Sequence, residues 1–401
     1  MDQVDVPHLF RSEFRRITSS LCRYHGIAHL QLAEDIASET FLAALETWPY
    51  RGKPDNPAAW LHRVARNKAL NLLKRAGREQ RTDEVVLATD MTDEAAWSTD
   101  GLHDSQLRMM FALSHPSLPA ESQVGLALRI LCGFGIQEIA SAFLASEETI
   151  SKRLYRAREI LRIKGVQMEF PETTQISQRL DAVLNTLYLL YSEGYYSECH
   201  DTVLREDLCF EAMHLVRMLM DYPPANTPAT RSLYALMCFH ASRFRARKQV
   251  TGELILYNEQ DRSQWDHALI AEGSHYLHLA SSGDILTRYH VEATIAWWLT
   301  VDESNTSKWP SILSLYEHLQ HFGTSPMVLL NRNYALYKVE GAATAISETE
   351  KLGWMGNQFY HALLAVLYAP SDPVRSQEHY QETLKLVKTR GDIDLIRKKL
   401  T

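Results

Sequence analysis

Apolar residues recur at spacings of three and four along almost the whole chain, and sustained alternation of apolar and polar residues is rare. The first pattern places apolar side chains on one face of an α-helix, whereas alternation is typical of a β-strand. The sequence therefore predicts an all-α protein.

The segment Leu30–Trp48 shows this helical spacing clearly. Pro49 and Gly52 follow it and are expected to end the helix, because both residues are unfavourable inside one. We therefore expect one helix with an apolar side and an acidic side. On the apolar side we place Leu32, Ile36, Thr40, Leu42, Leu45 and Trp48, and elsewhere Glu34, Asp35, Glu39 and Glu46.

A second helix is expected to begin at Asn56-Pro57 and to run to about Arg75. Proline is tolerated in a first turn, because its missing N–H would have no partner there. The apolar side chains expected to pack from this helix are Trp60, Val64, Leu70 and Leu73.

The following segment, Thr82–Leu107, lacks helical periodicity and holds seven acidic residues but no lysine or arginine. Such a one-sided charge block is typical of an extended linker. We therefore predict a first helical domain at residues 1–81, an acidic linker at 82–106, a separately folded second domain at 107–165 and a helical extension at 166–401.

An internal repeat lies near the C-terminus. Ser347–Leu352 (SETEKL) and Gln381–Leu386 (QETLKL) match at four of six positions with an offset of 34 residues, which Tyr334 and Tyr368 share. This is the period of tetratricopeptide helix pairs, which must stack to bury their apolar faces. We predict tetratricopeptide-like repeats near residues 327–390.

Composition excludes several classes of protein. Of the 401 residues, 45% are hydrophobic and 23% are charged, which is typical of globular domains. The N-terminal segment does not have the pattern of a signal peptide, and no later run is apolar enough for a membrane span, so we expect a cytoplasmic protein without membrane contact. Five scattered cysteines are expected to be buried thiols, and we expect neither a metal site nor a cofactor.

The net charge of −7 is unevenly distributed. Residues 1–165 hold equal numbers of basic and acidic residues, 21 of each, whereas residues 166–401 hold 21 basic and 28 acidic residues. Within the first part, Trp60–Arg81 holds seven basic residues and one acidic residue. The basic residues that nucleic-acid binding requires are therefore concentrated in one segment, although the whole chain is acidic.

The segment Ile136–Arg162 (IQEIASAFLASEETISKRLYRAREILR) predicts a helix-turn-helix. A short first helix is followed by a turn at Ala145-Ser146 and by a second helix whose outer face is basic. A helix of this kind can enter the major groove, with its N-terminal residues at base edges and its arginines on phosphates. This combination favours DNA binding over a hairpin with a solvated face. The inner side chains are expected to be Ile136, Ile139, Ala140 and Phe143 in the first helix and Ile150, Leu154, Ala157 and Leu161 in the second.

The helix at Pro57–Arg75 carries cations and side-chain amides on its remaining surface, which suits a single-stranded or melted DNA backbone. On its own this face could equally be a solvated one. Nothing near the acidic helix Ala33–Trp48 resembles a substrate pocket. This helix is more naturally a docking surface for a basic partner.

The order of these segments resembles an extracytoplasmic-function sigma factor of the sigma-70 family. AEDIASETFLAALETW (Ala33–Trp48) is similar to the region 2 helix that docks on the RNA polymerase clamp, and NPAAWLHRVARNKALNLLKR (56–75) to the helix that melts and reads the −10 element. Ile136–Arg162 resembles region 4, which reads the −35 element and sits on the polymerase flap. The resemblance covers residues 8–165 and implies binding to core RNA polymerase and promoter DNA.

Together, the motifs and the resemblance assign the candidate residues. Polymerase contacts are expected at Asp35, Glu39, Phe41 and Trp48; −10 contacts at Arg63, Arg66, Asn67, Lys68, Asn71, Lys74 and Arg75; and −35 contacts at Glu148, Thr149, Ser151, Lys152, Arg153, Arg156 and Arg158.

The extension resembles that of one sigma factor subgroup, through Leu187–Ser197, Leu236–Arg247 and the segment that begins at Glu259-Gln260-Asp261. This resemblance implies an association with small YCII-related proteins and regulation of the sigma domains in cis. The charge distribution also suggests that the acidic extension contacts the basic helices of the same chain.

Two other functions stay open from the sequence. The chain could be a helix-turn-helix repressor or activator whose helical domain senses a ligand or a protein. It could also carry an enzyme site in the extension, lined by Tyr195, His200, Asp261, Arg262, Trp265 and His290, although we expect no enzymatic activity.

Overall fold

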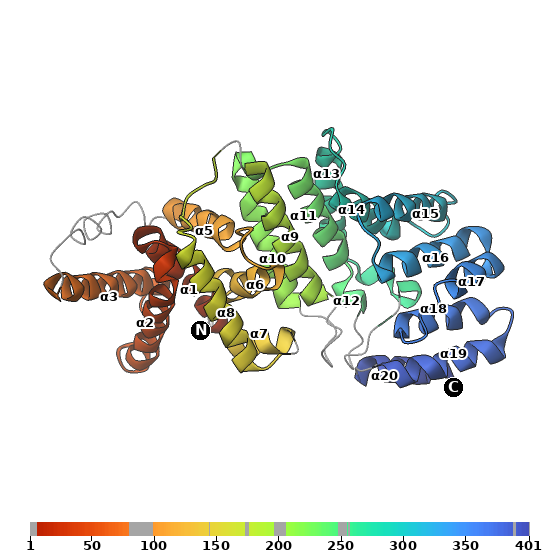
Figure 1. Cartoon of the computed structure of the whole chain (residues 1–401), viewed down its shortest axis with the longest axis horizontal. Coiled ribbons are helices and arrows are strands. Elements are labelled where there is room, and N and C mark those ends of the chain that lie inside the picture. Colours follow the sequence, from red (N-terminus) through yellow and green to blue (C-terminus); the bar gives the residue numbers. More distant parts are fainter. Residues whose placement is uncertain are drawn as a thin grey trace. The chain divides into compact units, whose positions relative to one another are not determined.

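A computed structural model describes residues 6–79, 99–143, 145–172, 176–195, 206–247, 255, 257–387 and 390–400. The regular elements in these ranges are all helices (Figure 1), so the all-α prediction is confirmed. The chain divides into two compact units, unit 1 at Met1–Leu190 and unit 2 at Tyr191–Thr401.

Unit 1 is built around its first helix. The side chains of Phe14, Ile17 and Leu21 in α1 are fully buried, and α1 packs against α2, α3 and α5. The helices of unit 1 are α1 (Val6–His25), η1 (Ile27–His29), α2 (Leu30–Arg51), α3 (Pro57–Glu79), α5 (Thr99–Leu113), α6 (Ala120–Leu126), η3 (Ala127–Leu131), α7 (Ile136–Ala142), α8 (Glu147–Ile163) and most of α9 (Ile176–Tyr195).

The predicted acidic linker is shorter than expected. Residues 82–98 lie outside the described residues, but residues 99–106 belong to helix α5. Leu102, Ser105 and Gln106 of this helix are buried, and α5 packs on α1. The prediction of two separately folded domains is therefore corrected, since helices from both sides of the linker share one core.

The boundary predicted at residue 165 is also corrected. The ring of Phe170 packs edge-on against that of Phe111, with ring centroids 6.3 Å apart. The guanidinium carbon of Arg108 lies 4.5 Å from the ring centroid of Phe170. From α9, Arg179 donates a hydrogen bond of 2.7 Å to the carbonyl of Phe111. The start of the predicted extension thus completes unit 1.

Unit 2 consists of helices that pack largely in sequence order. They are α10 (Glu206–Asp221), η4 (Pro223–Ala225), α11 (Pro228–Ala241), α12 (Phe244–Arg247), η5 (Tyr257–Glu259), η6 (Arg262–Gln264), α13 (His267–Ala280), α14 (Arg288–Thr300), α15 (Lys308–Leu319), η7 (Gln320–Phe322), α16 (Pro326–Glu340), α17 (Ala342–Glu350), α18 (Gln358–Tyr368), α19 (Pro373–Leu386) and α20 (Arg390–Leu400).

The internal repeat corresponds to two successive helix pairs, α16–α17 and α18–α19 (Figure 1). Each helix packs on the next, and Leu330, Ala345, Tyr360 and Leu364 form a shared core. SETEKL and QETLKL lie at the ends of α17 and α19. This is the packing that stacked helix pairs use to bury their apolar faces.

A half-buried histidine is expected to make the stability of unit 2 depend on pH. Burial, together with nearby Arg243 and Arg247, holds the pKa of His240 well below its usual value. The unfolded chain binds a proton here near pH 6.5, whereas the folded chain does not. We expect urea unfolding to show a loss of stability below pH 6.5, by up to about 1.4 kcal/mol per pH unit from this residue. The His240→Gln variant should show a smaller pH slope, and an unchanged slope would contradict the assignment.

Within the described residues, no helix is both long and apolar enough to cross a bilayer. Cys22, Cys132, Cys209 and Cys238 are free and buried, as expected, whereas Cys199 lies outside the described residues.

Candidate nucleic-acid interface

The helix-turn-helix is formed by α7 and α8. Ile150, Leu154, Ala157 and Leu161 of α8 are buried, which confirms the predicted inner stripe. Ser146 caps α8, because its side-chain oxygen accepts a hydrogen bond of 3.2 Å from the Thr149 backbone N–H. Local sequence chemistry thus fixes the start of the helix and its phase.

Part of the predicted outer face of α8 is available to solvent. Glu148, Thr149, Lys152 and Arg156 are exposed, and Lys152 donates a hydrogen bond of 2.6 Å to Glu148. Ser151 is half-buried. Glu148, Thr149 and Lys152 occupy the N-terminal half of the helix, which is the part that would reach base edges, and Arg156 lies just beyond it.

The other two predicted −35 residues are held by contacts within unit 1. Arg153 pairs with Glu121 at 2.9 Å and lies over the ring of Phe143. Arg158 points to α2, where its Nη2 lies 2.5 Å from the carboxylate of Glu34. The prediction that Arg153 and Arg158 lie on a fully solvated basic face is therefore wrong in this structure.

Helix α3 turns a different face to the core from the one predicted. Leu61, Ala65 and Ala69 are buried, whereas Trp60 and Leu70 are only half-buried. Val64 is also half-buried, and the side chain of Leu73 lies outside those described. The inner face of α3 therefore includes two alanines, where α3 packs on α1 and α2.

The predicted −10 residues lie on the outer part of α3. Arg63, Asn67 and Asn71 are exposed, and Arg66 is half-buried. Lys68 forms an ion pair of 2.9 Å with Glu39 of α2, which joins a predicted −10 residue to a predicted polymerase residue. The side chains of Lys74 and Arg75 lie outside those described.

Helix α2 differs most from its predicted amphipathic pattern. Glu34, which the sequence places on the solvated side, is only 2% exposed, whereas Leu42 and Leu45 are 56% and 62% exposed. Phe41 is buried against Phe10, with ring centroids 4.5 Å apart, which corrects its placement on the contact surface.

The remaining polymerase candidates are accessible. Asp35 and Glu39 are exposed, and Trp48 is half-buried against Trp60 at a centroid distance of 5.6 Å. Near the end of α2, Tyr50 is 89% exposed. The exposure of Leu42 and Leu45 was not predicted, although their spacing of three beside the acidic positions is a signal that could have placed them on the outer surface.

Two separate segments of the chain match known protein families. The Sigma-70 region 2 family matches residues 9–79, which span α1, α2 and α3. The chain belongs to the extracytoplasmic-function sigma-70 family. A family of unknown function, DUF6596, matches residues 179–281, so this sigma factor carries a C-terminal extension with its own family relationship.

Individual relatives cover the chain to different extents. An uncharacterized protein of Rhizobium meliloti is 36% identical over 86% of this chain and 82% of its own length. The sigma factor SigE of Mycolicibacterium smegmatis is 28% identical over 40% of this chain and 63% of its own length. The sigma-E factor of Salmonella typhimurium is 25% identical over 40% of this chain and 92% of its own length. No solved structure gives a significant match.

The extension residues considered for an enzyme site have structural partners. Asp261 caps the short helix η6, His290 hydrogen-bonds Thr287 at the start of α14, and Tyr195 accepts a hydrogen bond from Arg243. His200 lies outside the described residues. Among the described residues, no three metal-binding side chains are grouped to hold an ion.

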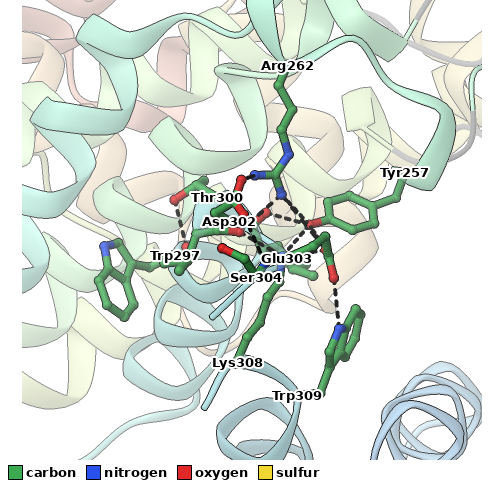
Figure 2. Close-up of polar contacts among 11 residues, drawn as sticks. Tyr257, Arg262, Trp297, Thr300, Asp302, Glu303, Ser304, Lys308 and Trp309 are labelled. Atoms are coloured by element: carbon green, nitrogen blue, oxygen red, sulfur yellow. Dashed lines mark hydrogen bonds and ion pairs between the residues drawn. The ribbon is translucent and has the colours of Figure 1, made fainter. Parts of the chain in front are cut away.

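The remaining two candidates belong to a polar network in unit 2. Arg262 lies over the ring of Trp265 and donates to the carbonyl of Val301, and its guanidinium pairs with Asp302 at 3.3 Å. Figure 2 shows this network converging on Tyr257, Glu303 and Lys308. The residues therefore join the loop before α13 to the loop before α15.

Proposed function

We propose that this sigma factor binds core RNA polymerase, recognises −10 and −35 promoter elements and initiates transcription, with its activity modulated by unit 2. The observation that supports this best is the presence of two candidate DNA-binding helices, α3 and α8, in a chain whose α1–α3 segment matches sigma-70 region 2. A repressor would need only the second of these helices.

For the −35 element, we propose that α8 enters the major groove by its N-terminal half. Thr149 and Lys152 are exposed there and would reach base edges, while Arg156 would hold phosphate. For the −10 element, Arg63, Asn67 and Asn71 on α3 would bind the melted strand, with the amides at base edges and the cation on the backbone.

For the polymerase, we propose that α2 docks on the clamp and region 4 on the flap. Unstacking promoter bases costs a few kcal/mol per base, so contacts to the polymerase must contribute to opening the promoter. The exposed acidic and apolar side chains of α2 suit a partner that offers basic and apolar groups.

Run-off transcription with purified core polymerase tests the proposal. We expect promoter-specific transcripts only when both the polymerase and this protein are present, and we expect the two to purify together. A helix-turn-helix repressor or activator would instead bind duplex DNA without the polymerase. Specific duplex binding combined with no transcript and no polymerase complex would overturn the proposal.

Substitutions on α8 separate phosphate contacts from base contacts. Arg156→Ala is expected to weaken binding to all −35 sequences alike and to reduce the salt dependence of binding by about one phosphate contact. Thr149→Ala and Lys152→Ala are expected to change sequence preference. Binding titrations against variant duplexes at several salt concentrations measure both effects, and equal behaviour of the three variants would show that the assigned recognition face is wrong.

For unit 2, we propose regulation in cis through its acidic residues, together with binding of a YCII-related protein. The excess of acidic residues after residue 165 supports the contact in cis, and the resemblance of the extension to one sigma factor subgroup supports the YCII-related partner. A chain that ends at Tyr195 keeps unit 1 and α9 whole. If this chain transcribes and binds DNA like the full chain, cis regulation is wrong.

A further inference from the structure

Three aromatic side chains of unit 2 surround one lysine ammonium. The Nζ atom of Lys338 in α16 lies 5.5, 5.6 and 5.7 Å from the ring centroids of Trp309, Tyr334 and Tyr337, respectively. The rings of Trp309 and Tyr334 meet edge to face, with centroids 5.7 Å apart. We call these three rings the aromatic cage, because they lie around a single point.

The local sequence and two cores hold the aromatic cage in place. Tyr334, Tyr337 and Lys338 share one face of α16, since they are spaced by three and four residues. Trp309 comes from the start of α15, which packs on α16. Trp309 packs against the core around Ile312, whereas Tyr337 packs against the core that α16, α17 and α18 share. The rings are therefore fixed by packing that does not depend on Lys338.

A carboxylate lies beside the aromatic cage. Oε2 of Glu303 accepts a hydrogen bond of 2.9 Å from Nε1 of Trp309 (Figure 2). Burial raises the pKa of Tyr334, and the nearby Glu303 carboxylate adds to this rise. Lys308 also faces the Trp309 ring, at 5.7 Å, but its ammonium pairs with Oε1 of Glu303 at 2.6 Å. Since Glu303 offsets this second positive charge, the ring faces remain attractive to a cation.

The distances in the aromatic cage suit a larger cation than an ammonium group. Carbon atoms in contact are about 3.5–4.0 Å apart, and a carbon–nitrogen bond adds about 1.5 Å. The nitrogen of a quaternary ammonium whose methyl groups touch the rings would therefore lie about 5–5.5 Å from them. The distances from Lys338 Nζ are close to this value, whereas a bare ammonium in contact would lie nearer to the rings.

Lys338 occupies the aromatic cage without being tied there by charge. Its side chain is exposed, and within the described part of the chain its ammonium contacts the rings but forms no ion pair. A lysine ammonium is strongly hydrated, so it loses little when it moves from the rings into water. An external cation can therefore replace it.

We propose that the aromatic cage binds the quaternary ammonium group of a small ligand of the choline type, and that Lys338 is a tethered occupant which this ligand displaces. Aromatic rings recognise such groups because the ring faces are negative and the methyl groups fill the space between them. The proposal goes beyond the promoter function, and its test needs neither polymerase nor DNA.

Isothermal titration calorimetry of the full chain with choline chloride, at constant ionic strength, tests the site. We expect saturable binding, and Lys338→Ala should raise the affinity about threefold or more because it vacates the cage. The alcohol 3,3-dimethylbutan-1-ol has the shape of choline but no charge, so it should bind at least about tenfold more weakly. Equal binding of the two compounds would show an apolar pocket and overturn the proposal.

Variants of the rings locate the binding site. Trp309→Leu and Tyr337→Leu each remove one ring and should lower the affinity for choline about tenfold. Tyr337→Phe keeps the ring, so it should recover most of the affinity that Tyr337→Leu loses. This pair of variants decides the question even if Trp309→Leu fails to fold. If Tyr337→Leu binds choline as the wild-type chain does, the aromatic cage is not the site.

The matched control is Lys385→Ala, which removes an exposed lysine on α19. It should leave the affinity for choline unchanged, because this lysine does not contact the aromatic cage. A rise in affinity equal to that of Lys338→Ala would show a general effect of removing positive charge and would contradict displacement. Absence of saturable choline binding in both the wild-type chain and Lys338→Ala would overturn the proposal outright.

Discussion

Replacing both Leu42 and Leu45 with aspartate is expected to reduce promoter-specific transcription about 100-fold at limiting core polymerase. The two side chains are 56% and 62% exposed and lie three residues apart on α2, so they form one apolar surface. Apolar anchors at the centre of an interface contribute about 1–2 kcal/mol each, and every 1.4 kcal/mol is tenfold in affinity. Titration of core polymerase with the variant, in competition with the wild-type chain, measures the loss.

A control is Val374→Asp, which introduces one aspartate at another exposed apolar position, on α19 of unit 2. It should leave polymerase affinity within about twofold of the wild type, because exposed side chains outside an interface contribute little. If the Leu42/Leu45 variant binds polymerase normally, the apolar surface of α2 is not the docking surface. A loss that Val374→Asp shares would instead indicate a nonspecific effect of added negative charge.

The helix-turn-helix could be predicted closely because its determinants are local. The stripe from Ile150 to Leu161 has the spacing of one helix face, and Ser146 is a residue that begins helices. Both signals lie within one turn or two of the positions they fix. The sequence therefore predicted which side of α8 faces inward without reference to the rest of the chain.

Helices α2 and α3 were harder to phase because they carry more than one apolar stripe. In α2, Leu42 and Leu45 are as apolar as the buried Ile36 and Phe41, so spacing alone does not decide which set faces the core. In α3 the inner positions include the alanines Ala65 and Ala69, which give a weak periodic signal. The inner faces are set by the packing of α1, α2 and α3 against one another, which the spacing within a single helix does not report.

The burial of Glu34 could not be predicted from its own segment. A carboxylate is normally solvated, and it is buried here only because Arg129 and Arg158 meet it from 95 and 124 residues away. The same applies to the start of α5, where acidic residues suggest a linker, although Leu102 is buried in a helix that packs on α1. Partners far away in the sequence thus decide whether these residues are buried.

Lys308 is a third residue whose environment the sequence conceals. Lysine is almost never fully buried, yet this side chain is 0% exposed at the start of α15. Its ammonium donates to the Tyr257 hydroxyl at 2.8 Å, to the Val301 carbonyl at 2.8 Å and to Glu303 at 2.6 Å (Figure 2). All three donors of the ammonium therefore have acceptors, which makes its burial tolerable.

Replacing Lys308 with methionine is expected to destabilise unit 2 by about 2–3 kcal/mol, since the side chain keeps its length while three acceptors each lose one of their donors. The expected loss is below that of a fully buried ion pair because Glu303 is 49% exposed and can be hydrated. Urea unfolding of the full chain, followed by circular dichroism, measures the change. The control Lys351→Met breaks an exposed pair with Glu348 and should change the stability far less, because solvent screens an exposed ion pair. Equal effects of the two substitutions would show that the network around Tyr257 does not stabilise the fold beyond an ordinary surface ion pair.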